Sequence, residues 1–237
     1  ANAVGENVVV AFDRDGAAQP VWWPRCVEVN GVPQVDRNYL QLNSIAPGAS
    51  VRDSYFTAST DRIARRRPGH LSFSVDRAGV LFSGRTREVV ARGLTRPHSA
   101  RRARSRVWLA NSGYGEVGFV ERGRYEPVAR LSGWTRGLCL VDDVIFVGSS
   151  RLIEEFRHYG PGLEADASEC AVHALSKTTG ARLGSLGWPR GYQIYGVEAV
   201  PAAFSGGFLQ TRERPSLARA LEDEVFFAFR TDRTGQA

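Results

Sequence analysis

Four stretches of the chain follow one repeated plan, and this repeat limits the fold more than any other feature. Each copy begins with a short apolar segment that carries a polar residue, and a polar turn then leads to a second strand that ends in small residues. The copies are residues 40–46 with 55–58, 94–100 with 108–111, 134–140 with 145–148, and 194–200 with 208–211. A partial fifth copy has residues 1–5 as its first strand and 8–12 as its second. A small β-unit that cannot bury both of its faces alone is typical of β-propeller blades.

Short β-rich runs between turn residues recur along the whole chain, whereas helical periodicity is scarce. The runs are residues 8–12, 54–57, 71–75, 107–110, 144–147 and 225–229. Two hairpins, each around a polar turn that contains glycine, are expected to form the outer halves of blades: 69–75 with 79–84, and 171–175 with 181–186. We therefore predict an all-β protein, a single β-propeller domain over residues 1–237 with about five or six blades.

The copies are unevenly spaced. Asn43, His98, Arg136 and Tyr195 occupy the same position in successive copies, and the first and third of the intervals between them are the long ones. Insertions would account for the difference, because propeller repeats usually run to about 40–50 residues. We expect one insertion at residues 62–69 and a second at 154–167, the latter a loop inserted between blades.

The net charge is a poor argument for a nucleic-acid partner. The chain carries a formal charge of +6, but Lys177 is its only lysine, and a GC-rich bacterial gene gives such an arginine bias without any selection for nucleic acid. The arginine clusters at 65–67 and 101–106 lie in polar stretches without interleaved aromatic residues. We expect no specific nucleic-acid binding.

Cysteine content and hydropathy indicate the cellular compartment in which a chain of this sequence is expected. Cys26, Cys139 and Cys170 are widely spaced, which favours buried thiols over a disulfide framework or a CxxC metal site. No apolar run approaches the roughly 20 residues that cross a bilayer, and the first residues lack the pattern of a secretory signal. The expectation is a soluble, cytoplasmic protein with no membrane partner.

The middle third of the chain has the most specific motifs. They read Thr-Arg-Pro-His-Ser-Ala-Arg at 95–101, Asn-Ser-Gly-Tyr-Gly-Glu at 111–116 and Thr-Arg-Gly-Leu at 135–138. In order and spacing they resemble a bacterial family of β-propeller-like proteins called domain of unknown function 4915, although Ala100 stands where that family usually has a second proline. The resemblance covers about residues 38–201 and implies a propeller fold. It brings no established reaction with it.

The repeat also predicts a functional site. The innermost strand of each propeller blade lines a central channel, so equivalent positions of successive blades converge. We expect Asn43, His98, Arg136 and Tyr195 to face one another, with Glu198 three residues beyond the last. The predicted catalytic residues are His98, Tyr195 and Glu198, because imidazole, phenol and carboxyl groups exchange protons.

Four further residues are predicted to bind the substrate: Asn43, Arg136, Trp134 and His158. The planar fork of Arg136 suits a carboxylate or phosphate, and Trp134 would stack on the ligand beside it. His158 lies in the expected inserted loop and would cap the mouth of the channel. Structural roles are the alternative for each residue: a backbone hydrogen bond for His98, an ion pair between blades for Arg136, and packing for Tyr195 and Trp134.

Two functions stay open at this point. The first is a small-molecule enzyme of lyase, cyclase, isomerase or hydrolase type that uses the acid and base groups of the channel on a substrate with an anionic group. The alternative is a non-catalytic propeller that binds a ligand or another protein. No nucleotide or flavin fingerprint occurs, so no cofactor is predicted. Calcium stays a minority alternative, because it needs several oxygen ligands and only Asn43 and Glu198 offer them at the repeat positions.

Overall fold

The computed structural model describes residues 1–189 and 191–201. The chain divides into two compact units, Ala1–Glu198 and Ala199–Ala237, and all of the described strands belong to the first. The expected strands at 208–211 and 225–229 lie outside the described residues.

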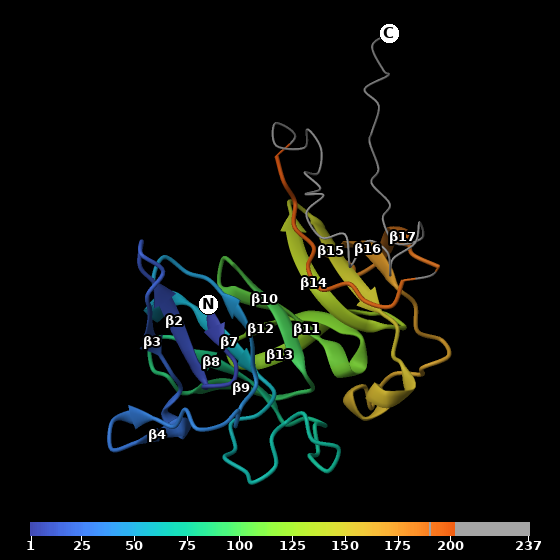
Figure 1. The fold of residues 1–237 in the computed structure, drawn as a ribbon. Helices are drawn as coiled ribbons and strands as arrows, with labels where there is room; N and C mark the ends of the chain where they lie inside the picture. Colours follow the sequence, from blue (N-terminus) through green and yellow to red (C-terminus); the bar gives the residue numbers. More distant parts are fainter. Residues whose placement is uncertain (190, 202–237) are drawn as a thin grey trace, which may run out of the picture. The chain divides into compact units, whose positions relative to one another are not determined.

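The first unit is all-β, as predicted, and is built from five antiparallel sheets. Three are four-stranded, and in each the strands pair in the order in which they occur along the chain (Figure 1). They consist of β6 (Leu42–Ala46), β7 (Tyr55–Ala58), β8 (Gly79–Ser83) and β9 (Val89–Leu94); β10 (Pro97–Ala103), β11 (Arg106–Asn111), β12 (Glu116–Glu121) and β13 (Arg124–Arg130); and β14 (Trp134–Val141), β15 (Val144–Ser150), β16 (Ala171–Ser176) and β17 (Arg182–Gly187).

Two smaller sheets precede these. A three-stranded sheet contains β1 (Asn2–Ala3), β2 (Val8–Phe12) and β3 (Ala18–Trp22), and β4 (Glu28–Val29) pairs with β5 (Val32–Pro33). Helical structure in the described residues consists of 3₁₀ turns: η1 (Arg25–Val27), η2 (Val51–Asp53), η3 (Ser112–Tyr114) and η4 (Glu154–Tyr159). No described helix has the length and apolar character that a membrane crossing requires.

The first strands of neighbouring sheets are in contact: β1 with β6, β6 with β10, and β10 with β14. Side-chain hydroxyls join them, because Ser44 Oγ accepts a hydrogen bond from the Ala100 amide at 3.0 Å and Ser99 Oγ accepts one from the Gly137 amide at 2.9 Å. A register shift occurs near the start of each strand, at Asn43 in β6, between His98 and Arg101 in β10, and at Gly137 in β14. A bulge of this kind bends a strand and redirects its side chains.

Three apolar clusters fill the spaces between successive sheets. Trp22, Phe56 and Phe82 belong to the first, Leu81, Leu94 and Leu109 to the second, and Trp108, Leu138 and Ile145 to the third. Each cluster takes residues from two neighbouring sheets, so the three-stranded sheet and the three four-stranded sheets depend on one another to bury their faces.

One of the two expected hairpins is confirmed and the other is wrong. Residues 171–176 pair with 182–187 as β16 and β17, but residues 69–75 form turns, and β8 pairs instead with β9. The polar groups of that segment are satisfied locally, since the His70 amide donates to the Arg67 carbonyl and the Phe73 amide to the His70 carbonyl, both at 2.9 Å. A segment that closes its own turns has no free amides to offer a neighbouring strand.

The two expected insertions occupy equivalent places. Residues 62–69 lie between β7 and β8, and residues 154–167 lie between β15 and β16. Both therefore connect the second and third strands within a sheet, and neither links one sheet to the next. Their loops meet, because the Tyr159 hydroxyl donates to the Gly69 carbonyl at 2.9 Å.

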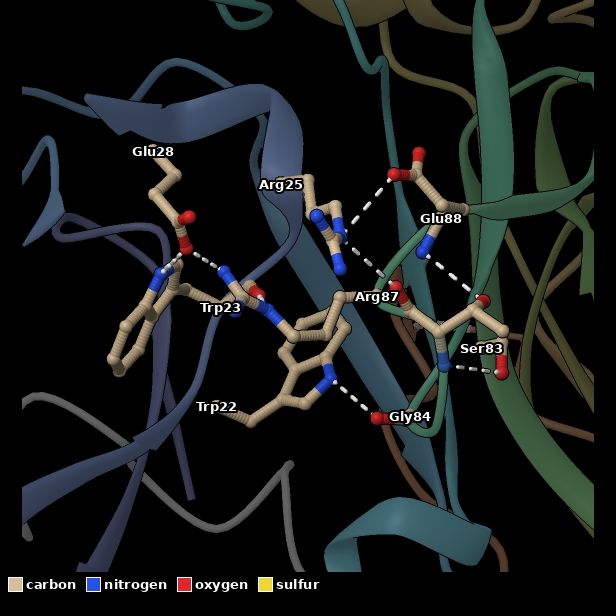
Figure 2. Close-up of polar contacts among 9 residues, drawn as sticks. Trp22, Trp23, Arg25, Glu28, Ser83, Gly84, Arg87 and Glu88 are labelled. Carbon is tan, nitrogen blue, oxygen red and sulfur yellow. Dashed lines mark hydrogen bonds and ion pairs between the residues drawn. The ribbon is translucent and has the colours of Figure 1, made fainter. Parts of the chain in front are cut away.

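A polar joint ties the end of β3 to the turn between β8 and β9 (Figure 2). Trp22 Nε1 donates to the Gly84 carbonyl at 3.1 Å, and Arg87 Nε donates to the Trp23 carbonyl at 2.8 Å. Glu28 accepts from both Trp23 Nε1, at 2.8 Å, and Arg87. These donors lower the pKa of the Glu28 carboxyl, Arg87 having the largest effect. The ring of Trp22 stacks on Phe56 with centroids 3.9 Å apart, so the joint and the first apolar cluster share a residue.

Replacement of Trp22 tests this arrangement. The side chain is 3% exposed, and Trp22→Ala should lower the free energy of unfolding by about 3–5 kcal/mol, because it leaves a cavity and an unpaired carbonyl. Val21→Ala is the control, since Val21 is partly exposed on the opposite face of the strand; it should cost no more than about 0.5 kcal/mol. Urea unfolding followed by circular dichroism measures both values. Equal losses would contradict the packing described.

Candidate functional site

A histidine and an arginine from neighbouring sheets form the centre of the candidate site. Arg136 Nη2, from β14, lies 3.1 Å from His98 Nε2, from β10, and both side chains are half-buried. Burial, followed by the positive charges of Arg136 and Arg96, holds the pKa of His98 well below its usual 6.5. The imidazole is therefore neutral at physiological pH, and its Nε2 lone pair accepts the arginine N–H.

Two aromatic rings flank the Arg136 guanidinium. Its Cζ lies 5.1 Å from the Trp134 ring centroid and 5.0 Å from that of Tyr195. Tyr195 is 69% exposed and belongs to a segment without strand pairing. A hydrogen bond from the Ile194 amide to Ser150 Oγ, at 2.9 Å, attaches this segment to β15. Gly137 permits this approach, because a Cβ there would stand 2.7 Å from the Val197 nitrogen.

Sequence reasoning did not select Arg96, which is the most deeply buried charge of the site, with 2% of its surface exposed. Its guanidinium donates to Gln41 Oε1 and, at 2.5 Å, to the Pro68 carbonyl, and Cζ lies 3.9 Å from the Tyr159 ring centroid. Burial lowers the pKa of Arg96 to about 10, and repulsion by Arg136 adds to this effect.

A signal for Arg96 was present in the repeat. Arg96 precedes His98 by two positions, as Trp134 precedes Arg136 and Gln41 precedes Asn43. Arg96 and Gln41 lie just before their strands, and each has a φ of 52°. The residue two positions before the repeat position contacts the site in three copies, as Gln41, Arg96 or Trp134.

The insertion between β15 and β16 supplies an aromatic centre. Tyr159 lies edge-on to Trp134 with centroids 5.7 Å apart, and stacks on Phe156 at 5.5 Å. The ring of His158 lies 4.0 Å from that of Tyr159. Burial, with a smaller effect of the Arg96 charge, lowers the pKa of His158. The contacts thus form a continuous series in the order Arg96, Tyr159, Trp134, Arg136 and Tyr195, with two rings between the two cations.

Four buried nitrogen atoms of this series and of the adjoining His158 have no hydrogen-bond partner among the described residues. They are Arg96 Nε, Trp134 Nε1, Arg136 Nε and His158 Nε2. A buried polar group without a partner costs about 1–3 kcal/mol, and more if it is charged. Neither arginine forms an ion pair with a carboxylate within the part of the chain that the structure describes. Among the described residues the cluster therefore has too few acceptors for its donors, and neither arginine has a paired carboxylate.

Comparison with known proteins gives a family. The sequence profile described as domain of unknown function (DUF4915) matches residues 2–206. The chain belongs to the DUF4915 family. No curated protein is significantly similar to this DUF4915 chain.

Two solved structures of computationally designed proteins also match the DUF4915 chain. The Ika8 protein has 12% identity and a TM-score of 0.40, over 78% of this chain and 48% of that one. The Ika4 protein has 11% identity and a TM-score of 0.39, over 64% of this chain and 75% of that one. The DUF4915 chain thus spans about half the length of Ika8.

The other residues selected from the sequence make local contacts in this DUF4915 chain. Asn43 Nδ2 donates to Ser59 Oγ at 3.2 Å and to the Pro97 carbonyl at 3.0 Å, next to His98. Glu198 pairs with Arg101, three residues beyond His98 on β10. The structure thus brings His98, Trp134 and Tyr195 into contact with Arg136. His158 joins them through Tyr159, which lies edge-on to Trp134. In the described part of the chain, no three His, Cys, Asp or Glu side chains group as metal ligands would.

The charge of Arg136 should be detectable in the titration of His98. In Arg136→Gln the pKa of His98 should rise toward 6.5, because a nearby positive charge that opposes protonation is lost, while burial still keeps it below that value. NMR titration of the imidazole C–H signals measures the midpoint. Arg124→Gln, which removes an exposed arginine of β13, should leave it unchanged. An equal midpoint in wild type and Arg136→Gln would contradict the contact.

Proposed function

We propose that this DUF4915 chain binds a small anionic molecule at the series of cations and rings around Arg136. The observation that carries the proposal is that Arg96 and Arg136, which pack against aromatic rings, each have a buried Nε without a hydrogen-bond partner and no paired carboxylate among the described residues. Burial of polar groups without partners lowers the stability of the fold, and such groups are expected where a bound ligand supplies the missing acceptors.

An anion suits these donors better than a neutral ligand. Arginine offers N–H groups in a fixed planar fork that matches the oxygens of a carboxylate or phosphate. His98 holds one N–H of Arg136 Nη2, which leaves the guanidinium oriented and its Nε free. The rings of Trp134 and Tyr195 cover the faces of the guanidinium, so a ligand would reach the edge, where the N–H groups point.

We further propose that the sheets are blades of a β-propeller with about five or six blades, as the repeat predicts. The consecutive pairing of strands within each four-stranded sheet supports this interpretation, and so does the contact between successive first strands. The anion site would then lie where β10 and β14 approach the propeller axis.

Acid–base catalysis on the bound anion is the second candidate function. The unpartnered Nε2 of His158 favours it, because a neutral imidazole with a free nitrogen can take up or release a proton. Tyr195, exposed beside Arg136, offers a phenol on the other side. In this proposal His98 serves mainly to orient Arg136, since its Nε2 is occupied and its pKa is low.

Anion-dependent stabilisation tests the binding proposal. Phosphate, sulfate, malonate and acetate, each added at constant ionic strength, form the panel of probes. At least one should raise the Tm of the wild-type chain, because a ligand that binds only the folded state stabilises it, by about 2.7 kcal/mol at 100 times its Kd.

Arg136→Gln should lose most of that shift, whereas Arg124→Gln should retain it, since both variants remove one positive charge but only the first touches the site. If every anion shifts the Tm of both variants equally, the site proposal is wrong.

A further inference from the structure

The charge balance of the site limits its ligand beyond the proposed function, on which this inference rests. Arg96 lies over the Tyr159 ring, Tyr159 lies edge-on to Trp134, and Arg136 lies over Trp134, so a short series of ring contacts joins the two arginines. The two cations therefore belong to one electrostatic neighbourhood. With His98 neutral, the cluster carries two positive charges that no described carboxylate compensates.

The free donors are distributed over both arginines. On a guanidinium, Nε and Nη2 lie along the same edge and together form a fork. Arg136 uses Nη2 toward His98, and Arg96 uses Nη2 toward the Pro68 carbonyl, and on each the Nε group has no partner. Trp134 lies between them, edge-on to Tyr159 and under Arg136, and its Nε1 is a third free donor.

We propose that the ligand is a small dianion whose two negative charges neutralise Arg96 and Arg136 together. A monoanion at Arg136 would leave the Arg96 charge buried and unpaired, and a buried charge without a counter-charge is among the most costly features in a protein. A single phosphate-type group or two carboxylates on one molecule would supply the same chemistry.

Entry requires a local movement. The free nitrogen atoms are shielded from solvent by the surrounding residues, and the loops at residues 62–69 and 154–167 close over Arg96. They are fastened there by the Tyr159 hydroxyl on the Gly69 carbonyl and by Arg96 on the Pro68 carbonyl. A dianion therefore reaches Arg96 when the contact between Tyr159 and Gly69 opens.

Isothermal titration calorimetry at constant ionic strength tests the proposal with malonate and phosphate as dianions and acetate as the monoanion. The wild-type chain should bind at least one dianion about tenfold or more tightly than acetate. Arg96→Gln should weaken binding of that dianion about tenfold and leave acetate within about twofold, while Arg136→Gln should weaken both. Arg124→Gln is the charge-matched control. A preference for malonate indicates two carboxylates, and one for phosphate a single divalent group.

The inference fails if acetate binds as tightly as both dianions, or if Arg96→Gln changes no affinity. In either case loss of acetate binding in Arg136→Gln would still support the proposed function, whereas equal binding to all variants would overturn both.

Because Arg96 is buried, a second measurement covers the outcome in which Arg96→Gln does not fold. Inorganic phosphate changes from a dianion to a monoanion between about pH 8 and pH 6, whereas sulfate stays divalent. Affinity of the wild-type chain for phosphate should fall about fivefold or more over that range relative to sulfate. Parallel pH dependence of the two anions would overturn the requirement for two negative charges.

Discussion

The described unit depends on how the first strand of one sheet is joined to the first strand of the next. Two serine hydroxyls make this connection, Ser44 toward Ala100 and Ser99 toward Gly137, at points where the strand is bulged. At such a point an amide that would otherwise pair across its own sheet is free to bond sideways. Because the bulge recurs, the polar residue beside it recurs as well, and His98 and Arg136 arrive at one place from separate sheets.

The backbone close to these bulges is strained at the site. Arg96 and Ser99, on either side of His98, have φ values of 52° and 55°, a conformation that residues other than glycine adopt at some cost. Gly137 takes the corresponding conformation in β14 without that cost. Strain and unpartnered donors thus coincide around one histidine. Proteins depart from local rules of this kind mainly where a function compensates.

Much of this arrangement could be predicted from the sequence. The repeat indicates the first strands of the three four-stranded sheets, because alternating small apolar residues and a polar residue mark a strand with one packed face. Residues 69–75 were misread because Leu71, Phe73 and Val75 alternate as in a strand, while Pro68 and Gly69 set up turns that side chains then stabilise. Arg96 was missed for a different reason. Charged residues are rarely buried without a partner of opposite charge, so a buried Arg96 is not expected from the sequence. Arg96 packs instead on the ring of Tyr159, which lies 63 residues further along the chain in an insertion.

The hydrogen bond between Tyr159 and Gly69 joins two loops that are 90 residues apart. Each loop connects two strands of a different sheet, and neither loop forms strand pairs of its own. The contact therefore couples the local unfolding of one loop to that of the other. A ligand beneath it would slow amide exchange in both loops at once, although it touches few of their residues. The chain would then register occupancy of the site as a change in the rigidity of two distant surface segments.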